Sequence, residues 1–357
     1  MITKKWQFWL GGAVSVALLL LLLYQVDLGE LKNALQDANY SLLAPSIAIY
    51  FVAVWFRATR WRYLLAPMGS IPVRRLYPVV IIGYMANNLL PVRLGEVVRS
   101  YFLARQENIN TGSALATIAV ERIYDGITLL AFAALSAPWL LLLGEFDGTV
   151  DVSRTTGLLI LAGTVFAFSV FLALFTLLGS SASFANRLEG CLNIVPPGLR
   201  PKVKELFRTF VAGLAVLNSP GKHLALFIYS LPVWLLEGSM YFMLAYSFGI
   251  DEHFDSVWVL ILVVLLLTAT SNLATSIPSA IGGIGPFEVV AQKTLIALGV
   301  GGELALAYSG FVHLIALWLP VNLVGLALLW KNDLSLREIT ASRGTSGRAI
   351  EPTGELS

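Results

Sequence analysis

The chain has 357 residues, of which 57% are hydrophobic and only 13% are charged. Soluble domains carry about 25% charged residues, so this chain could not cover a water-facing surface, and its composition indicates an integral membrane protein. The net charge is only +2 and long neutral runs replace a basic stripe, which excludes a typical nucleic-acid binder. One cysteine, Cys191, cannot form an internal disulfide, and the three scattered histidines lack metal-ligand spacing. We therefore expect no metal and no cofactor.

A membrane-spanning helix needs about 20 apolar residues, because the bilayer offers no partner to unpaired backbone groups. The sequence predicts an all-α polytopic membrane protein with about six full spans plus two broken hairpins, or about eight or more spans if the hairpins cross fully. The first span follows basic residues like a signal peptide, but it lacks a cleavage site and is expected to be retained. The predicted full spans are 8–24, 42–56, 114–143, 157–178, 223–248 and 304–330.

Two apolar segments are interrupted by helix-breaking residues at equivalent places in the two halves of the chain. Segment 76–90 is followed by Pro91 and returns through 97–104, while 257–277 is followed by Pro278 and several glycines and returns through 286–298. Each pair is predicted to form a re-entrant hairpin, whose broken backbone must be surrounded by protein or line a water-filled cavity. The alternative is that each pair crosses the membrane as two tilted helices.

The two broken segments also share residues. Asn88-Leu89 precedes a Glu-Val-Val sequence at Glu96, and Asn272-Leu273 precedes another at Glu288. Because their predicted orientations are opposite, we interpret them as an inverted repeat, and such matching interruptions point to a transporter binding site near the midplane. The alternative is that proline and glycine simply kink ordinary membrane helices.

The distribution of Lys and Arg predicts the orientation, because cytoplasmic loops are enriched in these residues. Basic residues crowd 57–75 and 187–222, whereas 27–37, 145–151 and 251–255 are acidic. We therefore expect a multi-pass protein of the inner (plasma) membrane with both termini cytoplasmic. The predicted transmembrane unit is 1–331, with halves 1–178 and 223–331, a cytoplasmic amphipathic linker at 179–222 and a disordered cytoplasmic tail at 332–357.

Ionisable residues within predicted spans are costly and usually face a cavity or a partner. Arg93, Glu96 and Arg99 recur every three residues around a helix start, an arrangement that suits a phosphate group. Glu96 would then neutralise part of the positive charge when no anion is bound. The alternative is a salt-bridge cluster that only fixes the hairpin.

A second cluster consists of Glu121, Arg122 and Asp125, with both carboxylates on one helix face. It is either part of the substrate path or a charge partner of the first hairpin. Glu237 lies in mid-span with no base nearby in sequence, so it requires a distant partner or a protonated state.

The segment 277–288 is rich in glycine, but no Gly-Lys-Ser/Thr follows it and no strand precedes it, which excludes a P-loop and a dinucleotide fingerprint. Its glycines instead let an unwound backbone approach a ligand or a neighbouring helix closely. The complete predicted lipid path is Asn88, Pro91, Arg93, Gly95, Glu96, Arg99, Glu121, Arg122, Asp125, Glu237, Gly282, Gly283, Gly285 and Glu288.

These residues resemble the flippase-like membrane family typified by the N-terminal transmembrane region of lysylphosphatidylglycerol synthases. The resemblance extends from about Trp6 to Trp330 and implies translocation of an anionic or modified lipid, with the Pro-Arg-Leu-Gly-Glu and Gly-Gly-x-Gly regions lining the path. The soluble aminoacyl-transferring domain has no counterpart, so we expect no enzyme activity. The resemblance is carried by Arg57-x-x-Arg60-Trp61, Asn88 to Arg99, Glu121-Arg122-Ile-Tyr-Asp125-Gly126, and Ile277 to Glu288.

The sequence therefore predicts flipping of a phospholipid, aminoacyl-phospholipid, polyprenyl phosphate, or hopanoid or glycosylated lipid without ATP hydrolysis. The expected partners are membrane lipids and a separate lipid-synthesising enzyme, with no nucleic acid. Two alternatives remain open, a membrane-embedded lipid-modifying transferase and a non-transporting scaffold subunit. For a transferase, Glu121 and Asp125 are the obvious acid-base pair.

Overall fold

The computed structural model describes residues 26–90, 94–146, 154–194, 219–276 and 281–331, and a few single residues near 20–24 and between 196 and 211. All regular elements in these parts are helical, which confirms the predicted all-α membrane fold. The predicted span 8–24 and the tail 332–357 lie almost wholly outside the described residues. Within the described residues, five helical stretches are long and apolar enough to cross a membrane: Tyr40–Met68, Thr111–Leu143, Pro220–Ser247, Val257–Ala274 and Gly302–Trp330.

The helices follow one another along the chain, and a π-helical turn at Phe311–Trp318 joins the last two. Their bounds are α2 (Leu28–Asp37), α3 (Leu43–Leu65), α4 (Val73–Leu89), α5 (Gly95–Glu107), α6 (Thr111–Leu143), α7 (Arg154–Ser180), α8 (Ala182–Cys191), α10 (Pro220–Ser247), α11 (Val257–Ala274), α12 (Pro286–Ile296), α13 (Gly302–Gly310) and α14 (Leu319–Lys331).

Polar side chains fix where the long helices begin. The side chains of Asn110, Ser219 and Ser256 each accept a hydrogen bond from a backbone N–H in the first turn of α6, α10 and α11. Such caps satisfy donors that the helix itself leaves unpaired. Gly144 ends α6 in the left-handed conformation, with φ of 77°.

The predicted end of the second span at residue 56 is wrong, because α3 continues without a break to Leu65. Arg57 and Arg60, which the charge pattern placed in a cytoplasmic loop, lie on this helix and are 4% and 0% exposed. A buried guanidinium needs a carboxylate partner, and both residues find one on other helices. Arg57 and Arg60 therefore belong to the core of the molecule, whereas Arg62, Arg74 and Arg75 of the same basic run are exposed.

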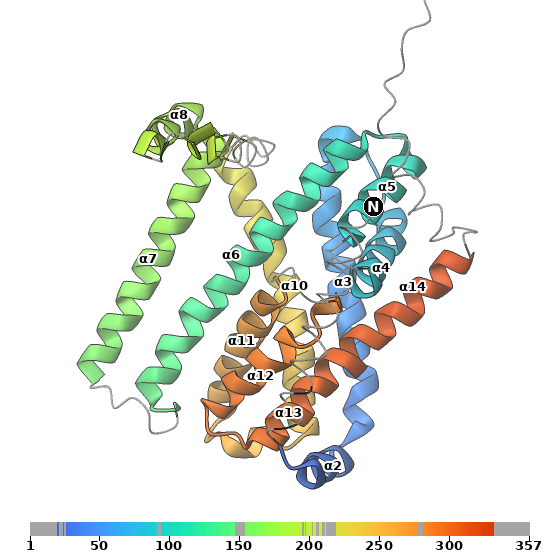
Figure 1. The fold of residues 1–357 in the computed structure, drawn as a ribbon, viewed down its shortest axis with the longest axis vertical. Coiled ribbons are helices and arrows are strands. Elements are labelled where there is room, and N and C mark those ends of the chain that lie inside the picture. The colour runs from blue at the N-terminus through green and yellow to red at the C-terminus, as the bar shows by residue number, and fades with distance from the viewer. Residues whose placement is uncertain are drawn as a thin grey trace, which may run out of the picture.

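The helices pack so that the two halves of the chain are interleaved (Figure 1). Helix α3 lies along α10, α6 packs between α5, α7 and α11, and α4 packs between α5 and α14. The short helices α4 and α5 lie in the upper part of Figure 1, and α11, α12 and α13 in the lower part. Helix α7 packs against α6 and carries α8 at its upper end, near the upper end of α10.

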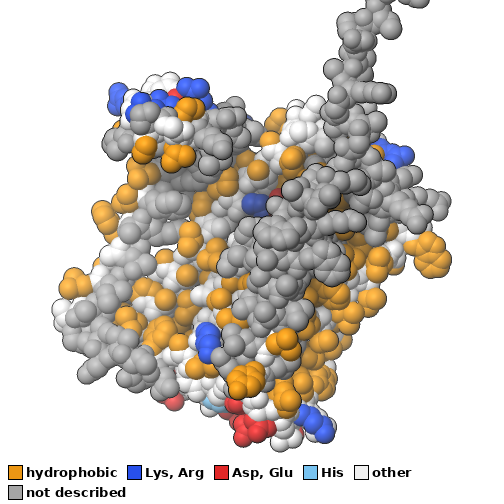
Figure 2. Space-filling model, in the orientation of Figure 1, with side chains coloured by type: hydrophobic (Ala, Val, Ile, Leu, Met, Phe, Trp, Pro, Cys, Tyr) orange, Lys and Arg blue, Asp and Glu red, His pale blue; other side chains and the backbone are white. Residues whose placement is uncertain are grey.

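Apolar side chains cover the outside of the bundle, and charges concentrate at its ends. Figure 2 shows hydrophobic side chains over the flanks, Lys and Arg gathered around α8, and most of the visible Asp and Glu at the opposite end. Around α8, Arg208 forms an ion pair with Glu189 at 2.7 Å. The hydrogen bonds from Arg208 hold the pKa of Glu189 below its usual value. The rest of the predicted amphipathic linker lies mostly outside the described residues.

Both predicted interruptions are present between helices. Helix α4 ends at Leu89 and α5 begins at Gly95, while α11 ends at Ala274 and α12 begins at Pro286. At the second interruption Gly282, Gly283 and Gly285 have φ of 62°, 77° and 97°, values that side chains with a Cβ rarely adopt. The glycine-rich segment is therefore unwound, as the sequence predicted.

Gly95 lets α4 and α5 touch, because a Cβ built on it would lie 2.0 Å from the carbonyl oxygen of Gly83. We expect Gly95→Ala to lower the thermal unfolding temperature of the purified protein in detergent, by an amount equivalent to roughly 1–3 kcal/mol. The control is Gly163→Ala on α7, where an added Cβ meets nothing within 4 Å. Equal stability of both variants would contradict the close approach of α4 and α5.

Candidate functional site

A cluster of charged side chains joins four helices in the interior. Helix α3 presents Arg57 and Arg60 one turn apart, and α6 presents Glu121 and Asp125 one turn apart. Side chains at these spacings share one helix face. Arg60 meets both acids of α6 in the core, whereas Arg57 meets Glu237 of α10.

Arg60 is the centre of this cluster. Its Nη1 donates to Asp125 Oδ1 at 2.7 Å and to Ser230 Oγ at 2.9 Å, and its Nε lies 3.6 Å from Glu121 Oε1. Arg60 and Glu121 are both 0% exposed. One guanidinium thus connects α3 to α6 and α10 away from water, where ion pairs are screened least.

Arg99 of α5 completes the same cluster from the other side. Its Nη1 lies 2.7 Å from Glu121 Oε2, and its guanidinium stacks 3.6 Å over the ring of Trp61. The indole N–H of Trp61 in turn donates to Thr117 Oγ1 at 2.9 Å. Arg99 therefore fixes α5 against α3 and α6, through both an ion pair and a cation–π contact.

Glu237 has the distant partner that its sequence environment required. Its carboxylate accepts a hydrogen bond from Arg57, a residue of α3 that is far away in sequence. Arg57 Nη1 also donates to Tyr84 Oη at 3.0 Å, and its guanidinium lies 4.7 Å from the ring of Trp234. This second ion pair connects α3, α4 and α10.

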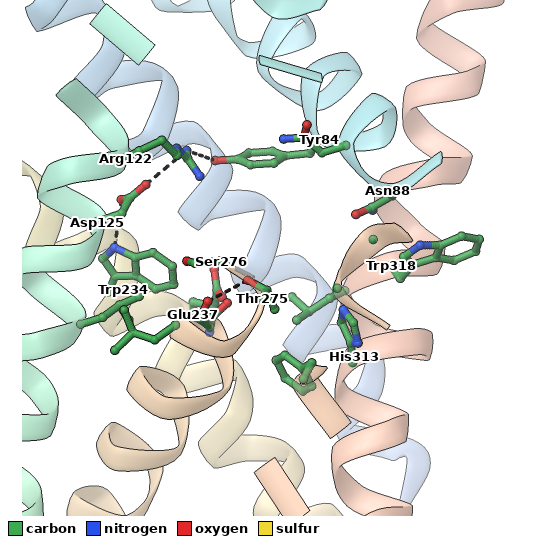
Figure 3. A pocket seen from close by; sticks show the side chains of 18 of the residues that line it. Tyr84, Asn88, Arg122, Asp125, Trp234, Glu237, Thr275, Ser276, His313 and Trp318 are labelled. Carbon is green, nitrogen blue, oxygen red and sulfur yellow. Dashed lines mark hydrogen bonds and ion pairs between the residues drawn. The ribbon is translucent and has the colours of Figure 1, made fainter. Parts of the chain in front are cut away.

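Arg122 is the most accessible cation of the cluster, with its side chain 29% exposed. Its Nη2 lies 3.2 Å from Asp125 Oδ2 and 3.5 Å from Tyr84 Oη. Figure 3 shows Arg122 between Tyr84 and Asp125, with the indole N–H of Trp234 also directed at Asp125. Glu96 approaches Arg122 Nε at 3.9 Å. The sequence suggested that Glu96 would neutralise part of the charge of the neighbouring arginines. In the structure the guanidinium of Arg99 pairs with Glu121 instead.

Four charged residues of the cluster, Arg57, Arg122, Asp125 and Glu237, line one side of a cavity of about 220 Å³. The opposite side, visible in Figure 3, carries Asn88, His313 and Trp318. The last turn of α4, at Asn87 and Asn88, and the residues after α11, at Thr275, Ser276, Gly282 and Gly283, both border the cavity. The full lining is Tyr50, Arg57, Tyr84, Asn87, Asn88, Arg122, Asp125, Gly126, Leu129, Trp234, Glu237, Asn272, Leu273, Thr275, Ser276, Gly282, Gly283, Phe287, His313, Leu317 and Trp318.

A third buried pair lies beside the glycine-rich turn. Glu288 Oε1 lies 2.7 Å from His313 Nδ1, and Glu288 Oε2 accepts a hydrogen bond from the backbone N–H of Gly285 at 2.7 Å. Phe287 stacks on the His313 ring at 4.3 Å between centroids. Glu288 therefore holds the unwound segment to the π-helical turn, and only His313 and Phe287 of this group face the cavity.

The predicted path residues separate into three groups. Asn88, Arg122, Asp125, Glu237, Gly282 and Gly283 line the cavity, whereas Gly95, Glu96, Arg99, Glu121, Gly285 and Glu288 support its walls. Pro91 and Arg93 lie outside the described residues. The structure also brings Arg57, Tyr84 and Trp234 into the wall, which sequence reasoning did not assign. The Arg-x-x-Arg-Trp sequence was a usable indication, since it places two cations on one face of an apolar helix, where each needs a carboxylate partner.

The described residues contain no group of three or more His, Cys, Asp or Glu that could hold a metal ion. The acids are paired with arginines or with His313. The arrangement offers instead a polar, charge-compensated cavity enclosed by helices, of the kind in which a membrane protein accommodates a polar group.

The fold and the site define a polytopic α-helical membrane protein with a polar cavity between its spans. The chain belongs to the family of the lysylphosphatidylglycerol synthase transmembrane region, which matches residues 8–324. The family resemblance that the motifs indicated is thereby confirmed.

Three relatives illustrate the similarity. A glycosyltransferase, AglD of Haloferax volcanii, is 26% identical over 315 residues, 83% of this chain, and the chain spans only 50% of that protein. A UPF0104 membrane protein of Methanothermobacter thermautotrophicus is 24% identical over 331 residues, 89% of this chain and 92% of the relative. UPF0104 membrane protein PH1989 of Pyrococcus horikoshii is 25% identical over 330 residues, 90% of this chain and 96% of the relative. No solved structure gives a significant match.

The buried ion pairs give a prediction for stability. Arg60→Gln leaves Asp125 and Glu121 without their shared cation, so we expect a loss of about 3–5 kcal/mol in the free energy of unfolding. The matched control is Arg75→Gln, because Arg75 pairs with Glu107 through a side chain that is 65% exposed, and we expect it to change stability by about 0.5 kcal/mol or less. Unfolding of both variants in detergent would measure the difference, and similar losses would contradict it.

Proposed function

We propose that this chain carries an anionic or modified lipid from one leaflet of the inner membrane to the other. The cavity between α3, α4, α6, α10 and the two interruptions is the observation that supports this. A polar headgroup cannot cross hydrocarbon unaided, because each unpaired polar group costs several kcal/mol there. In this mechanism the headgroup passes through the cavity while the acyl or prenyl chains stay in the surrounding lipid.

The two interrupted helix pairs act in this proposal as re-entrant hairpins related by an inverted repeat. Helices α4 and α5 occupy the upper part of the molecule in Figure 1, and α11 and α12 the lower part. The breaks between them border the same cavity. Transporters built from inverted repeats bind their cargo where such broken helices meet, and rock one unit against the other.

The charge distribution supports a cytoplasmic position for the α8 end. Cys191 is the one cysteine of the sequence and is exposed on α8, so a membrane-impermeant maleimide should label it only after cells are permeabilised. In a Cys191→Ser/Glu252→Cys variant, the new cysteine at the acidic end should react in intact cells. The reverse labelling pattern would contradict the proposed orientation.

Transport is testable in vesicles of phosphatidylcholine that contain a trace of a fluorescent lipid. Adding the protein should speed the exchange of the label between leaflets, measured as quenching by an external reductant. We expect Arg122→Gln to slow this exchange about tenfold or more, because Arg122 is the accessible cation of the wall and its loss leaves Asp125 partly unpaired. The control is Arg105→Gln, outside the cavity lining. Vesicles with and without wild-type protein that exchange equally would refute lipid transport.

A membrane-embedded transferase is the second candidate, because the relative AglD is a glycosyltransferase by name. The acid pair of α6 argues against it in this chain, since Glu121 and Asp125 are each bonded to an arginine and a general base must be free to take a proton. A modified lipid formed during incubation of the protein with activated sugar donors and vesicles would support the transferase instead. In the proposed function such chemistry belongs to a separate lipid-synthesising enzyme.

A further inference from the structure

The charges that line the cavity cancel. Among the described lining residues the cations are Arg57 and Arg122, and the full anions are Asp125 and Glu237. Arg57 is bonded to Glu237, and Arg122 lies 3.2 Å from Asp125. Both cations are therefore already engaged before any ligand enters.

The described cluster as a whole is also balanced, because four arginines meet four carboxylates. Asp125 is shared by Arg60 and Arg122, and Glu96 lies 3.9 Å from Arg122 Nε. Arg60 and Arg99 pair with Asp125 and Glu121 at 2.7 Å each. In the described part of the cluster every arginine has a carboxylate within 4 Å. A headgroup with a net charge would have to break one of these pairs and leave a buried charge uncompensated, which costs about 3–5 kcal/mol. An uncharged headgroup meets no such cost.

The remaining polar groups of the wall suit hydroxyls. Asn87, Asn88 and Asn272 contribute carboxamides. The Nδ2 groups of Asn88 and Asn272 already donate to protein acceptors, and a carboxamide oxygen can accept a hydrogen bond from a hydroxyl.

Among the lining residues, Asn87 Oδ1 and Trp318 Nε1 are the uncharged buried atoms without a hydrogen-bond partner in the described part of the molecule. One is an acceptor and the other a donor, and a hydroxyl can satisfy either. The charged lining residues also contribute such atoms, Nε of Arg57, Nε of Arg122 and Oδ2 of Asp125, but each of these groups already lies within 4 Å of an opposite charge.

Aromatic rings make up much of the rest of the cavity lining. Tyr50, Tyr84, Trp234, Phe287 and Trp318 all line the cavity. Aromatic faces pack against the C–H surfaces of a sugar or polyol, whose hydroxyls meanwhile point to the polar groups around the edge. A phosphate has no such apolar face. The cavity of about 220 Å³ is many times larger than the space of one water molecule and suits a small, compact group.

We propose that this cavity binds an uncharged, hydroxyl-rich headgroup, as in a glycosylated or polyol lipid, in preference to a phosphate or an ammonium group. The proposal rests on the proposed lipid transport and narrows its cargo. The ion pairs act as a charge filter in this arrangement, since they exclude ionised headgroups and shape the wall that the hydroxyls contact.

The test compares two fluorescent lipids with the same acyl chains, a glucosyl diacylglycerol and a phosphatidic acid, in protein-containing phosphatidylcholine vesicles. We expect the glucosyl lipid to exchange between leaflets at least tenfold faster. Equal rates, or a faster phosphatidic acid, would overturn the charge filter while leaving lipid transport intact. No acceleration of either lipid, or of labelled phosphatidylcholine, would instead remove the proposed function.

A variant that changes the charge of the cavity lining should shift the preference toward the anionic lipid. Glu237→Gln leaves Arg57 without its carboxylate and makes the lining positive, so the rate ratio of phosphatidic acid to glucosyl lipid should rise about tenfold or more. Glu189→Gln, which removes an exposed pair near α8, is the matched control and should leave the ratio unchanged. A folded Glu237→Gln protein with an unaltered ratio would overturn the proposal.

A second variant avoids disturbing the ion pairs. Trp318→Phe keeps a ring but removes the unpartnered N–H, so glucosyl-lipid exchange should fall about threefold to tenfold with phosphatidic acid unaffected. Trp330→Phe, at a tryptophan that is 87% exposed, is its control. Competition by free glucose would indicate that a soluble sugar also fits, and its absence that the lipid anchor is required. An equal loss for both lipids in Trp318→Phe would contradict hydroxyl recognition.

Discussion

The buried guanidinium of Arg60 is the interaction on which the rest of the site depends. It is 0% exposed and bridges Asp125, Glu121 and Ser230. Helices α3, α6 and α10 must therefore pack at fixed distances and rotations relative to one another for all of these contacts to form. Buried charges tolerate little misplacement, because an unpaired one costs several kcal/mol. The apolar surfaces of these helices could pack in several registers, and the ion pairs select one of them.

The same network gives the cavity its character. Arg99 extends it to α5, and Arg57 and Glu237 extend it to α4 and α10, so the walls are rigid and electrically neutral at once. A rigid, neutral and polar chamber next to two broken helices is unusual within a membrane bundle, where polar side chains normally signal a passage or a binding site. The structure and the proposed selectivity of this protein therefore rest on the same side chains.

Much of the architecture was predictable because the membrane imposes strong local rules. Apolar length gave the spans at 114–143 and 223–248 to within a few residues of α6 and α10. Proline and glycine gave both interruptions, and isolation in mid-span indicated that Glu237 needed a distant partner. The charge rule failed at Arg57 and Arg60, because it counts basic residues without knowing which of them find a carboxylate inside the protein.

The sequence by itself determined the class of protein, the helices, their breaks and the set of ionisable residues that had to be compensated, since each follows from composition or local spacing. Only the tertiary structure decided the pairing. Arg57 meets Glu237 and Asn88 meets Asn322 across most of the chain, and Arg99 turns to Glu121 and Trp61 rather than to the cavity. Complementary charges on separate helices carry no local signal of their partners, so the neutral lining emerges only when the helices are packed together.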